Sequence, residues 1–366
     1  MISNFFSQRW ILKLAKFCLS LLIVLLGLEL YLRFFVVNFE ALQNSRRQFL
    51  GEVPIPLAEL VPRCGWVNRV GTNRSETIAL ENVWPNGQRA SRPQISKKTT
   101  KRILMLGCSF TYGMGLRDRE TLAWLLNERF PEVQFDNYGV RRWGAYQCLM
   151  LTQYLLEERH EKYDQVLYFF IDDHVRRQFL WNIHGMLKLN NYFVVCPNVE
   201  KDARGWHFRP SCSFDWPAQD RLASVYFAHT LYFAQNIRRH VARHEQLTRE
   251  EQGKDDEQGW QVVRKCAAEM EEVCRRSGAK FAVVTLTGNT FVAEETIKNE
   301  GDWPCRVYDV SFPELNEPSY RNHGQLTLHP NFRAQRCWLT KLVPYLQNEE
   351  AAVSSLRQTY SLKDYP

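Results

Sequence analysis

The stretch ILMLGCSFTYGMG at residues 103–115 contains the clearest structural signal in the chain. Its first five residues form an uninterrupted apolar run of the length of a buried strand. An amphipathic stretch follows from Arg119 to Phe130, and Pro131 ends it. A buried strand that turns directly into a helix predicts an α/β domain. The turn places Ser109 at the carboxyl edge of the predicted sheet, where the N–H groups of the next helix favour negative charge.

The same alternation of strand and helix continues along the chain. Apolar runs predict further strands at residues 133–137, 165–171 and 280–286, with a candidate fifth at 307–310. Amphipathic stretches predict helices at residues 147–160, 221–244, 259–278 and 331–346. This order predicts a flavodoxin-like three-layer sandwich, in which a mostly parallel central sheet carries helices on both faces and the active site lies at the carboxyl ends of the strands.

Composition divides the chain into four segments. These are an N-terminal membrane anchor (1–39), a linker with irregular structure (40–100), the α/β domain (101–348) and a C-terminal tail (349–366). Within the domain, residues 175–220 break the rhythm with Trp, Asn, Pro and Cys, which predicts an insertion over or beside the active site. The charged run at 245–259 is interpreted as a solvated loop or helix end.

Residues 17–37 read FCLSLLIVLLGLELYLRFFVV and are long enough, as a helix, to cross a hydrocarbon layer of about 30 Å. Glu29 and Arg33 interrupt this run at a spacing of four, so they can pair on one helix face. A cleaved signal peptide and a buried soluble helix are the alternatives. The length of the run and the lack of a clear A-x-A site favour an anchor in the lipid bilayer.

Basic residues dominate the segment before the predicted span, namely Arg9, Lys13 and Lys16. The positive-inside bias therefore predicts a cytoplasmic N-terminus and an extracytoplasmic C-terminal domain, in the periplasm or outside the cell. The formal net charge of +7 arises from 47 basic and 40 acidic residues that are scattered along the chain. Without a basic stripe, nucleic acid is not an expected partner.

The ten cysteines include no pair of CxxC elements, which excludes a zinc ribbon. In an exported domain, Cys196 and Cys212 flank a loop-like segment and could form a disulfide, whereas Cys266 and Cys274 are eight residues apart on a predicted helix, too far to do so. His240 and His244 have the spacing of metal ligands, but no third ligand is evident. We expect neither a metal nor a cofactor.

Several short motifs resemble the conserved blocks of the GDSL/SGNH hydrolase family. GCSFTYG (107–113) is similar to the first block, G-D-S-F-T-x-G, with Cys108 in place of Asp. Three later segments resemble the remaining blocks in turn, namely DNYGVRRWGAYQ (136–147), YFFIDDH (168–174) and LHPNFRAQ (328–335). Upstream, VWPNGQRASRP (83–93) resembles the N-x-x-G-x-R segment of membrane-tethered members. The resemblance covers about residues 101–346 in order and spacing.

The resemblance implies a serine hydrolase. Ser109 would attack an ester carbonyl, and His329 would accept its proton and return it to the leaving alcohol. In the family, the oxyanion is bound by the backbone N–H of the nucleophile, by a glycine of the second block and by an asparagine of the third. The corresponding candidates for oxyanion or substrate binding are Gly139, Arg142 and His174.

The sequence departs from the family pattern at three places. Arg142 stands where the second block has a glycine, Asp172 stands in place of the third-block Asn, and the Asp expected shortly before His329 is replaced by Leu326, Thr327 and Leu328. Asp172 or Asp173 could orient His329 instead, or a Ser–His dyad could suffice. For His174 and for His323, contact with substrate and an ordinary polar position are equal alternatives.

Three functions are compatible with these motifs. The first is an esterase that removes acyl groups, in particular O-acetyl groups of a carbohydrate, through an acyl-enzyme on Ser109. The second is an O-acetyltransferase that passes the acyl group to a hydroxyl of an extracytoplasmic polysaccharide. The third is a catalytically inactive relative that binds a glycan or acts as a membrane scaffold. The expected partners are therefore an ester substrate, small or polymeric, and the bilayer.

Overall fold

The computed structural model describes residues 2–37, 58–61, 64–74, 80–92, 99–177, 186–189, 192–195, 198–202, 205–209, 212–213, 221–229, 231–232, 235, 249–287, 303–322 and 329–361. The chain forms two compact units. The smaller unit contains Met1–Val53, Leu187–Val194 and Ser213–Gln246. The larger unit contains Pro54–Met186, Val195–Cys212 and Leu247–Pro366.

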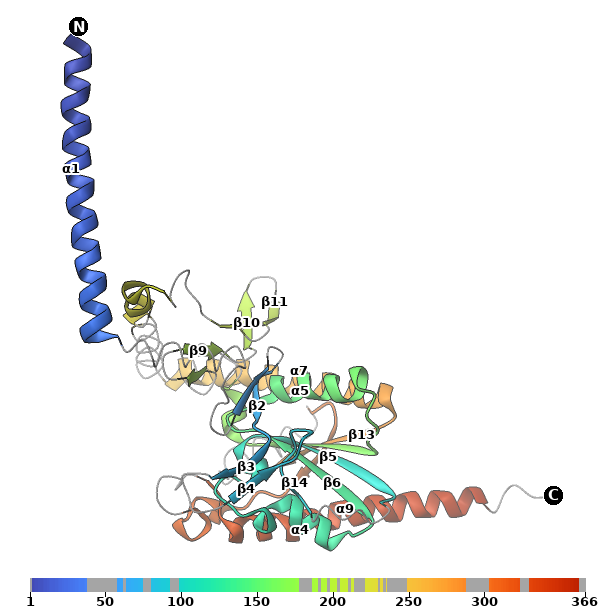
Figure 1. Ribbon diagram of the computed structural model, residues 1–366. Coiled ribbons are helices and arrows are strands. Elements are labelled where there is room, and N and C mark those ends of the chain that lie inside the picture. Colours follow the sequence, from blue (N-terminus) through green and yellow to red (C-terminus); the bar gives the residue numbers. More distant parts are fainter. Residues whose placement is uncertain are drawn as a thin grey trace. The chain divides into compact units, whose positions relative to one another are not determined.

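A five-stranded parallel sheet forms the centre of the larger unit (Figure 1). Its strands are β5 (Lys101–Gly107), β6 (Val133–Gly139), β7 (Gln165–Phe170), β13 (Lys280–Thr285) and β14 (Arg306–Asp309). The order across the sheet is β14-β13-β7-β5-β6. This is the flavodoxin-like order, which reverses direction between the first strand, β5, and the third, β7. The predicted α/β fold with its mostly parallel sheet is confirmed.

Helices cover both faces of this sheet (Figure 1). The first face packs against α4 (Leu122–Arg129) and α9 (Phe332–Ser361), and its core includes Met105, Leu167, Val284, Leu126 and Trp338. The opposite face carries α5 (Ala145–Gln153), the π-helical turn η3 (Tyr154–Glu158) and α7 (Arg249–Ser277). Alternate strand residues point to the two faces, so all six residues of the central strand β7 are buried. The helices on both sides cover the faces of the sheet. The candidate site therefore lies in the loops at the ends of the strands.

Short elements connect these layers. They are α3 (Ser109–Tyr112), η2 (Asp118–Glu120), η4 (Asp172–Val175), η7 (Pro313–Asn316) and η8 (Pro318–Tyr320). The described part of the predicted insertion contains strands, namely β8 (Met186–Leu189), β9 (Tyr192–Val195), β10 (Asn198–Asp202), β11 (Gly205–Arg209) and β12 (Cys212–Ser213). Strands β10 and β11 form an antiparallel hairpin.

Two antiparallel hairpins occupy part of the segment that we expected to be irregular. They pair β1 (Ala58–Val61) with β2 (Gly65–Asn68) and β3 (Gly71–Arg74) with β4 (Leu80–Val83). An isolated bridge then joins Arg89 to Asn137 of β6. Each of these strands is only four residues long and contains Gly, Asn or Glu. The sequence therefore lacks the alternation of apolar residues that would predict a strand. For these residues the expectation of irregular structure is wrong.

Two helices extend beyond their predicted limits. α7 begins at Arg249, within the charged run, and α9 continues through Pro344 to Ser361, within the predicted tail. Glu, Gln, Lys, Arg and Ala are strong helix formers, so a polar run without apolar periodicity can still extend a helix that is packed at its other end.

The smaller unit contains the N-terminal helix α1 (Ile2–Tyr31), which ends in the π-helical turn η1 (Leu32–Val36). Within it, Trp10–Val36 is long and apolar enough to cross a membrane, and its side chains are almost all exposed. Residues 223–229 of the same unit are helical. Cys196, His240, His244 and His323 lie outside the described residues, as do the residues that directly precede His329. Cys266 and Cys274 are separate free thiols.

Candidate active site

Ser109 is the first residue of the short helix α3, directly after β5. The turn that presents it depends on two glycines. A Cβ atom on Gly107 would lie 2.1 Å from Thr111 Oγ1, and one on Gly139 would lie 2.4 Å from the backbone nitrogen of Tyr112. Helix α3 ends at Gly113, whose φ of 75° is in the left-handed region. The carboxyl ends of β5 and β6 can therefore approach the nucleophile turn closely.

A second loop brings His329 to the same edge of the sheet. Asn322 N donates to the His329 carbonyl (2.8 Å), and Asn322 Nδ2 donates to the carbonyl of Met114 (3.2 Å), just after α3. Asn331 then begins α9, because its Oδ1 accepts from Arg333 N and Ala334 N. These bonds tie the loop before α9 to the turn after β5.

The two loops place an imidazole next to an alcohol. His329 Nε2 lies 3.1 Å from Ser109 Oγ, a hydrogen-bond distance between residues 220 positions apart. The side chain of Ser109 is nearly buried, with 5% exposed. The Phe110 ring packs edge-on against the imidazole with centroids 6.0 Å apart, which restricts its rotation. The predicted proximity of Ser109 and His329 is what the structure shows.

Burial, with a smaller contribution from the guanidinium groups of Arg177 and Arg141, lowers the pKa of His329 to about 4. The imidazole is therefore neutral over most of the physiological pH range. A neutral imidazole whose Nε2 carries no proton accepts the hydroxyl hydrogen of Ser109, as a general base must.

No described carboxylate orients His329. Its Nδ1 is buried and has no hydrogen-bond partner among the described residues. Asp173 instead pairs with Arg177 at 2.8 Å, with 61% of its side chain exposed, and Asp172 Oδ2 accepts from Thr287 Oγ1 at 2.7 Å. Of the two alternatives left by the sequence, orientation by Asp172 or Asp173 does not agree with the structure, because each carboxylate is held by a different partner. Within the described part of the chain, the site is a Ser–His dyad.

Asp172 begins η4 at the carboxyl end of β7, beside β5 at the point where the strand order reverses. Burial raises the pKa of this carboxyl to about 6; the Thr287 hydrogen bond lowers it and the neighbouring Asp173 raises it. Asp172 Oδ1 is buried without a partner among the described residues. When protonated, this carboxyl donates a hydrogen bond; when ionised, it only accepts.

Arg142 has a left-handed backbone conformation, which glycine adopts more easily than any other residue. Its φ is 66°, in the left-handed region that residues with a Cβ rarely adopt, while its side chain is exposed. No hydrogen bond to its N–H is found within the described residues. Within the described residues, the Arg142 N–H is therefore available as a hydrogen-bond donor.

Gly139 and His174 have roles other than those predicted. Gly139 N donates to Asn137 Oδ1 (3.0 Å), so it is not free for an oxyanion. His174 is fully buried, and its Nδ1 lies 2.7 Å from Tyr168 Oη with the two rings stacked. Burial lowers the pKa of His174 well below its ordinary value. Both residues support the packing beneath the site, and neither is placed to contact substrate.

Sequence reasoning missed a buried charged cluster beneath the turn that carries Ser109. Glu81 of β4 is fully buried; its Oε1 accepts from Gly115 N (2.9 Å) and its Oε2 from Tyr112 Oη (3.1 Å). The same carboxylate pairs with Arg141, the neighbour of Arg142, and with Arg89. Glu81 therefore links α3 to the loop after β6, two parts of the candidate site.

Arg89, the arginine of the N-x-x-G-x-R resemblance, is also fully buried. Its Nη2 lies 3.0 Å from Asp118 Oδ1 and donates to the Leu116 carbonyl at 2.7 Å, and its guanidinium lies over the Tyr112 ring. That motif was the one sequence signal that could have revealed the cluster. Buried charges need partners, and here each arginine has a carboxylate.

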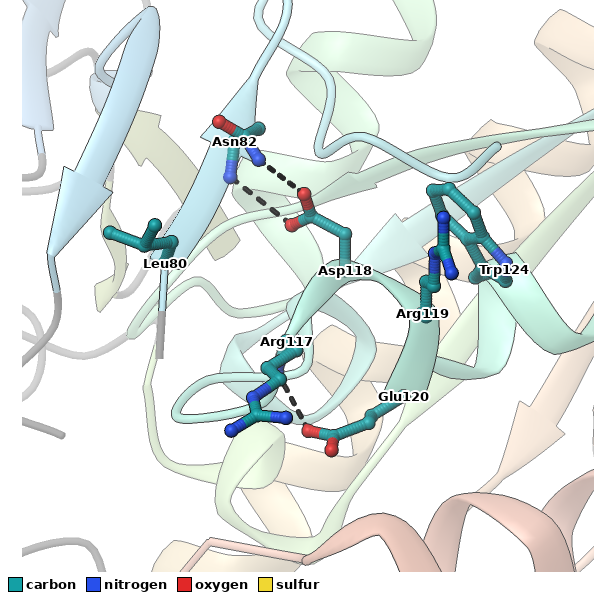
Figure 2. A pocket seen from close by; sticks show the side chains of 7 residues that line it. All are labelled: Leu80, Asn82, Arg117, Asp118, Arg119, Glu120 and Trp124. Carbon is teal, nitrogen blue, oxygen red and sulfur yellow. Dashed lines mark hydrogen bonds between the residues drawn. The ribbon is translucent and has the colours of Figure 1, made fainter. Parts of the chain in front are cut away.

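A hollow of about 550 Å³ opens beside this cluster, between β4 and the segment from η2 into α4. Figure 2 shows Asp118 hydrogen-bonded to Asn82, and Arg119 next to Trp124. The Arg119 guanidinium lies 5.8 Å from the centre of the Trp124 ring. The lining combines an indole with guanidinium, carboxylate and amide groups: Leu80, Asn82, Arg117, Asp118, Arg119, Glu120 and Trp124.

Comparison with known proteins finds similar folds but no close relative. No protein-family model and no curated protein matches the chain. Among solved structures, the chain resembles GDSL/SGNH lipolytic proteins. The psychrotrophic esterase EstA from Pseudoalteromonas sp. has 13% identity and a TM-score of 0.38, covering 69% of this chain and 99% of that one. A lipolytic G-D-S-L protein from Veillonella parvula has 10% identity and a TM-score of 0.36, covering 66% and 96%.

Proposed function

We propose that this protein is a membrane-anchored serine ester hydrolase of the GDSL/SGNH type. The observation that supports the proposal best is the distance of 3.1 Å between Ser109 Oγ and His329 Nε2, at the carboxyl edge of a parallel sheet. A nucleophile and a base within hydrogen-bond reach, at the reversal of the strand order, form the arrangement that acyl transfer requires. Asp172 at the end of β7 and the free N–H of Arg142 lie in the loops around this pair.

In the proposed mechanism, Ser109 Oγ attacks the ester carbonyl carbon while its proton passes to His329 Nε2. The N–H groups of Ser109 and Arg142, together with protonated Asp172, bind the oxyanion that develops. His329 then gives the proton to the leaving alcohol, which leaves an acyl group on Ser109. A water molecule, deprotonated by His329, attacks this acyl-enzyme and restores the free hydroxyl.

We further propose that the substrate carries O-acetyl groups on a carbohydrate. The hollow beside Asp118 supports this choice, because an indole surrounded by hydrogen-bonding side chains is suited to a sugar ring (Figure 2). The segment that lines it begins eight positions after Ser109 in the sequence. The apolar helix Trp10–Val36 would hold the hydrolase at the bilayer, outside the cytoplasm.

The test is covalent labelling of the full chain with a fluorophosphonate, which reacts with activated serines. We expect labelling of the wild type and none of Ser109→Ala; His329→Gln should label at least tenfold more slowly. Ser311→Ala, at an unrelated serine that bonds Thr285, is the matched control and should label like the wild type. A folded wild type that resists the probe would overturn the proposal.

A second assay separates hydrolysis from acyl transfer. An acetylated oligosaccharide is incubated with the protein, with and without an unacetylated acceptor sugar. Release of acetate in water, lost in Ser109→Ala, is the expected result. Labelled protein that releases acetate only when the acceptor is present, and transfers the acetyl group to it, would identify a transferase instead.

A further inference from the structure

Two charged side chains of the apolar helix hold the start of another helix in the smaller unit. Glu29 Oε1 accepts from Ala223 N (2.7 Å), and Glu29 Oε2 accepts from Ser224 N (3.0 Å) and Ser224 Oγ (2.8 Å). Arg33 Nη2 donates to the carbonyl of Arg221 (2.5 Å) and lies 3.5 Å from Glu29 Oε1. The carboxylate thus binds the free N–H groups at the start of the helical residues 223–229.

These bonds account for charges inside a membrane-spanning sequence. An ionised carboxylate in hydrocarbon is unfavourable unless it is paired and hydrogen-bonded. Glu29 has three hydrogen bonds and an ion pair, and its side chain is 14% exposed. Leu32, one turn later, is buried, whereas the apolar residues from Trp10 to Tyr31 are exposed. This end of the span therefore has a protein partner on one side.

The position of Glu29 fixes a depth. It lies seven residues before Val36, the end of the apolar span, which corresponds to about 10 Å along a helix. Amphipathic helices that lie along a membrane surface are buried about 5–10 Å into the boundary of headgroups and acyl chains. The helix of residues 223–229, whose first N–H groups bind Glu29, therefore begins at this boundary.

Large apolar side chains remain exposed along the bound helix. Leu222, Leu231 and Tyr232 have 40%, 46% and 52% of their surface exposed, while Tyr226 is buried within the unit. A tyrosine with an apolar ring and a polar tip suits the interface between lipid and water. Leu222 directly precedes the residues bound to Glu29, and Leu231 and Tyr232 follow them in sequence.

We propose that the docked segment, defined as residues 221–229 together with 231 and 232, lies in the headgroup–acyl boundary of the bilayer that α1 spans, attached to α1 by Glu29 and Arg33. The protein then contacts the membrane twice, once through a span and once along the surface. This contact does not depend on the proposed ester hydrolysis. It gives the two charges in the span a structural purpose.

The experiment uses the full chain in lipid nanodiscs that contain a phospholipid with a photoreactive diazirine high on its acyl chain. After illumination, peptide mass spectrometry locates the lipid adducts. We expect adducts on α1 and on the docked segment. Glu29→Leu should reduce adducts on the docked segment at least fivefold and leave those on α1 unchanged. Glu272→Gln, an exposed carboxylate of α7 paired with Arg275, is the matched control and should change neither.

Each other outcome overturns the inference. Adducts on α1 but none on the docked segment would show that this segment does not contact lipid. Equal labelling of the docked segment in Glu29→Leu and wild type would show that Glu29 does not attach it. Absence of adducts from both would remove the bilayer contact altogether, and fluorophosphonate labelling of Ser109 in the same sample would show whether the hydrolase proposal survives separately.

Discussion

Asp172 sets the expected dependence of activity on pH. The proposed base, His329, is active when unprotonated, so activity rises as the pH increases through its pKa of about 4. The proposed donor, Asp172, is active when protonated, so activity falls as the pH increases through its pKa of about 6. We predict a bell-shaped profile of kcat/KM with a maximum near the middle of this interval.

The variant Asp172→Asn should remove the fall on the alkaline side, because an amide donates a hydrogen bond at every pH. At pH 7.5 we expect kcat/KM to increase about thirtyfold, since only about 3% of a carboxyl with a pKa of about 6 is then protonated. Asp173→Asn, which changes the exposed neighbour, is the control and should keep the alkaline limb. A wild type with maximal activity above pH 7 would contradict the assigned role of Asp172.

Arg142 carries backbone strain that glycine would relieve. Its φ of 66° disfavours any residue with a Cβ by about 1 kcal/mol, although glycine also gains freedom in the unfolded chain. We predict that Arg142→Gly raises the free energy of unfolding by less than about 1 kcal/mol and preserves kcat/KM within threefold, because the N–H remains. Urea unfolding and ester hydrolysis measure the two quantities.

His160→Gly provides the comparison for Arg142. His160 also has a positive φ, of 53°, and it follows η3, away from the candidate site. A similar gain in stability is expected there, with no change in activity. A loss of activity above tenfold in Arg142→Gly alone would show that the guanidinium, and not the backbone, contacts the substrate.

At the scale of elements, the site depends on how closely β6 approaches α3. A Cβ atom at position 139 would lie 2.4 Å from Tyr112 N and 2.8 Å from Thr111 C, and both contacts are with backbone that cannot move without shifting the nucleophile. We predict that Gly139→Ala lowers the free energy of unfolding by about 1–3 kcal/mol. Activity should fall at least tenfold, because Ser109 is displaced from His329.

The matched control for this packing effect is Gly27→Ala. Gly27 lies in α1 with no atom within 4 Å of an added Cβ, so alanine should not lower stability and should leave activity unchanged. Thermal unfolding and fluorophosphonate labelling rates report the two effects separately. If Gly139→Ala were labelled at the wild-type rate, the prediction would be contradicted, because α3 could then move away from β6 without displacing Ser109.

At the scale of the molecule, orientation in the membrane follows from the ends of the span. Lys13 and Lys16 precede the apolar core of α1, which favours a cytoplasmic N-terminus. We predict that the domain after the span is protected from added protease in sealed vesicles that expose the cytoplasmic face. It should become digestible once detergent opens them.

An engineered change in charge tests this orientation. Lys13→Glu together with Lys16→Glu replaces two of the three basic residues near the N-terminal end of α1 and should reduce the protected fraction in such vesicles. Full digestion of the wild-type domain in intact vesicles would place it in the cytoplasm and contradict the proposed location of the substrate.

The sequence by itself determined the order of strands and helices of the central sheet, and the motifs that resemble the GDSL/SGNH blocks pointed to Ser109 and His329 as partners. Apolar runs of strand length and amphipathic stretches report burial locally, and the right-handed crossovers of a parallel sheet then bring the loops after the strands to one edge. The sequence also marked Arg142, which stands where the resembling block has a glycine. The structure shows that its backbone has the positive φ that glycine adopts most easily.

Only the tertiary structure decided which charges meet. Glu81 joins Arg89 and Arg141, Asp172 and Asp173 bind Thr287 and Arg177 instead of His329, and Glu29 binds the start of a helix nearly 200 positions later. A single polar residue has no periodicity, so its burial and its partner depend on packing between elements distant in the chain. His174 looked like a site residue because it follows two aspartates at the end of a strand, but its ring is fully buried against Tyr168, whereas Asp173 is exposed.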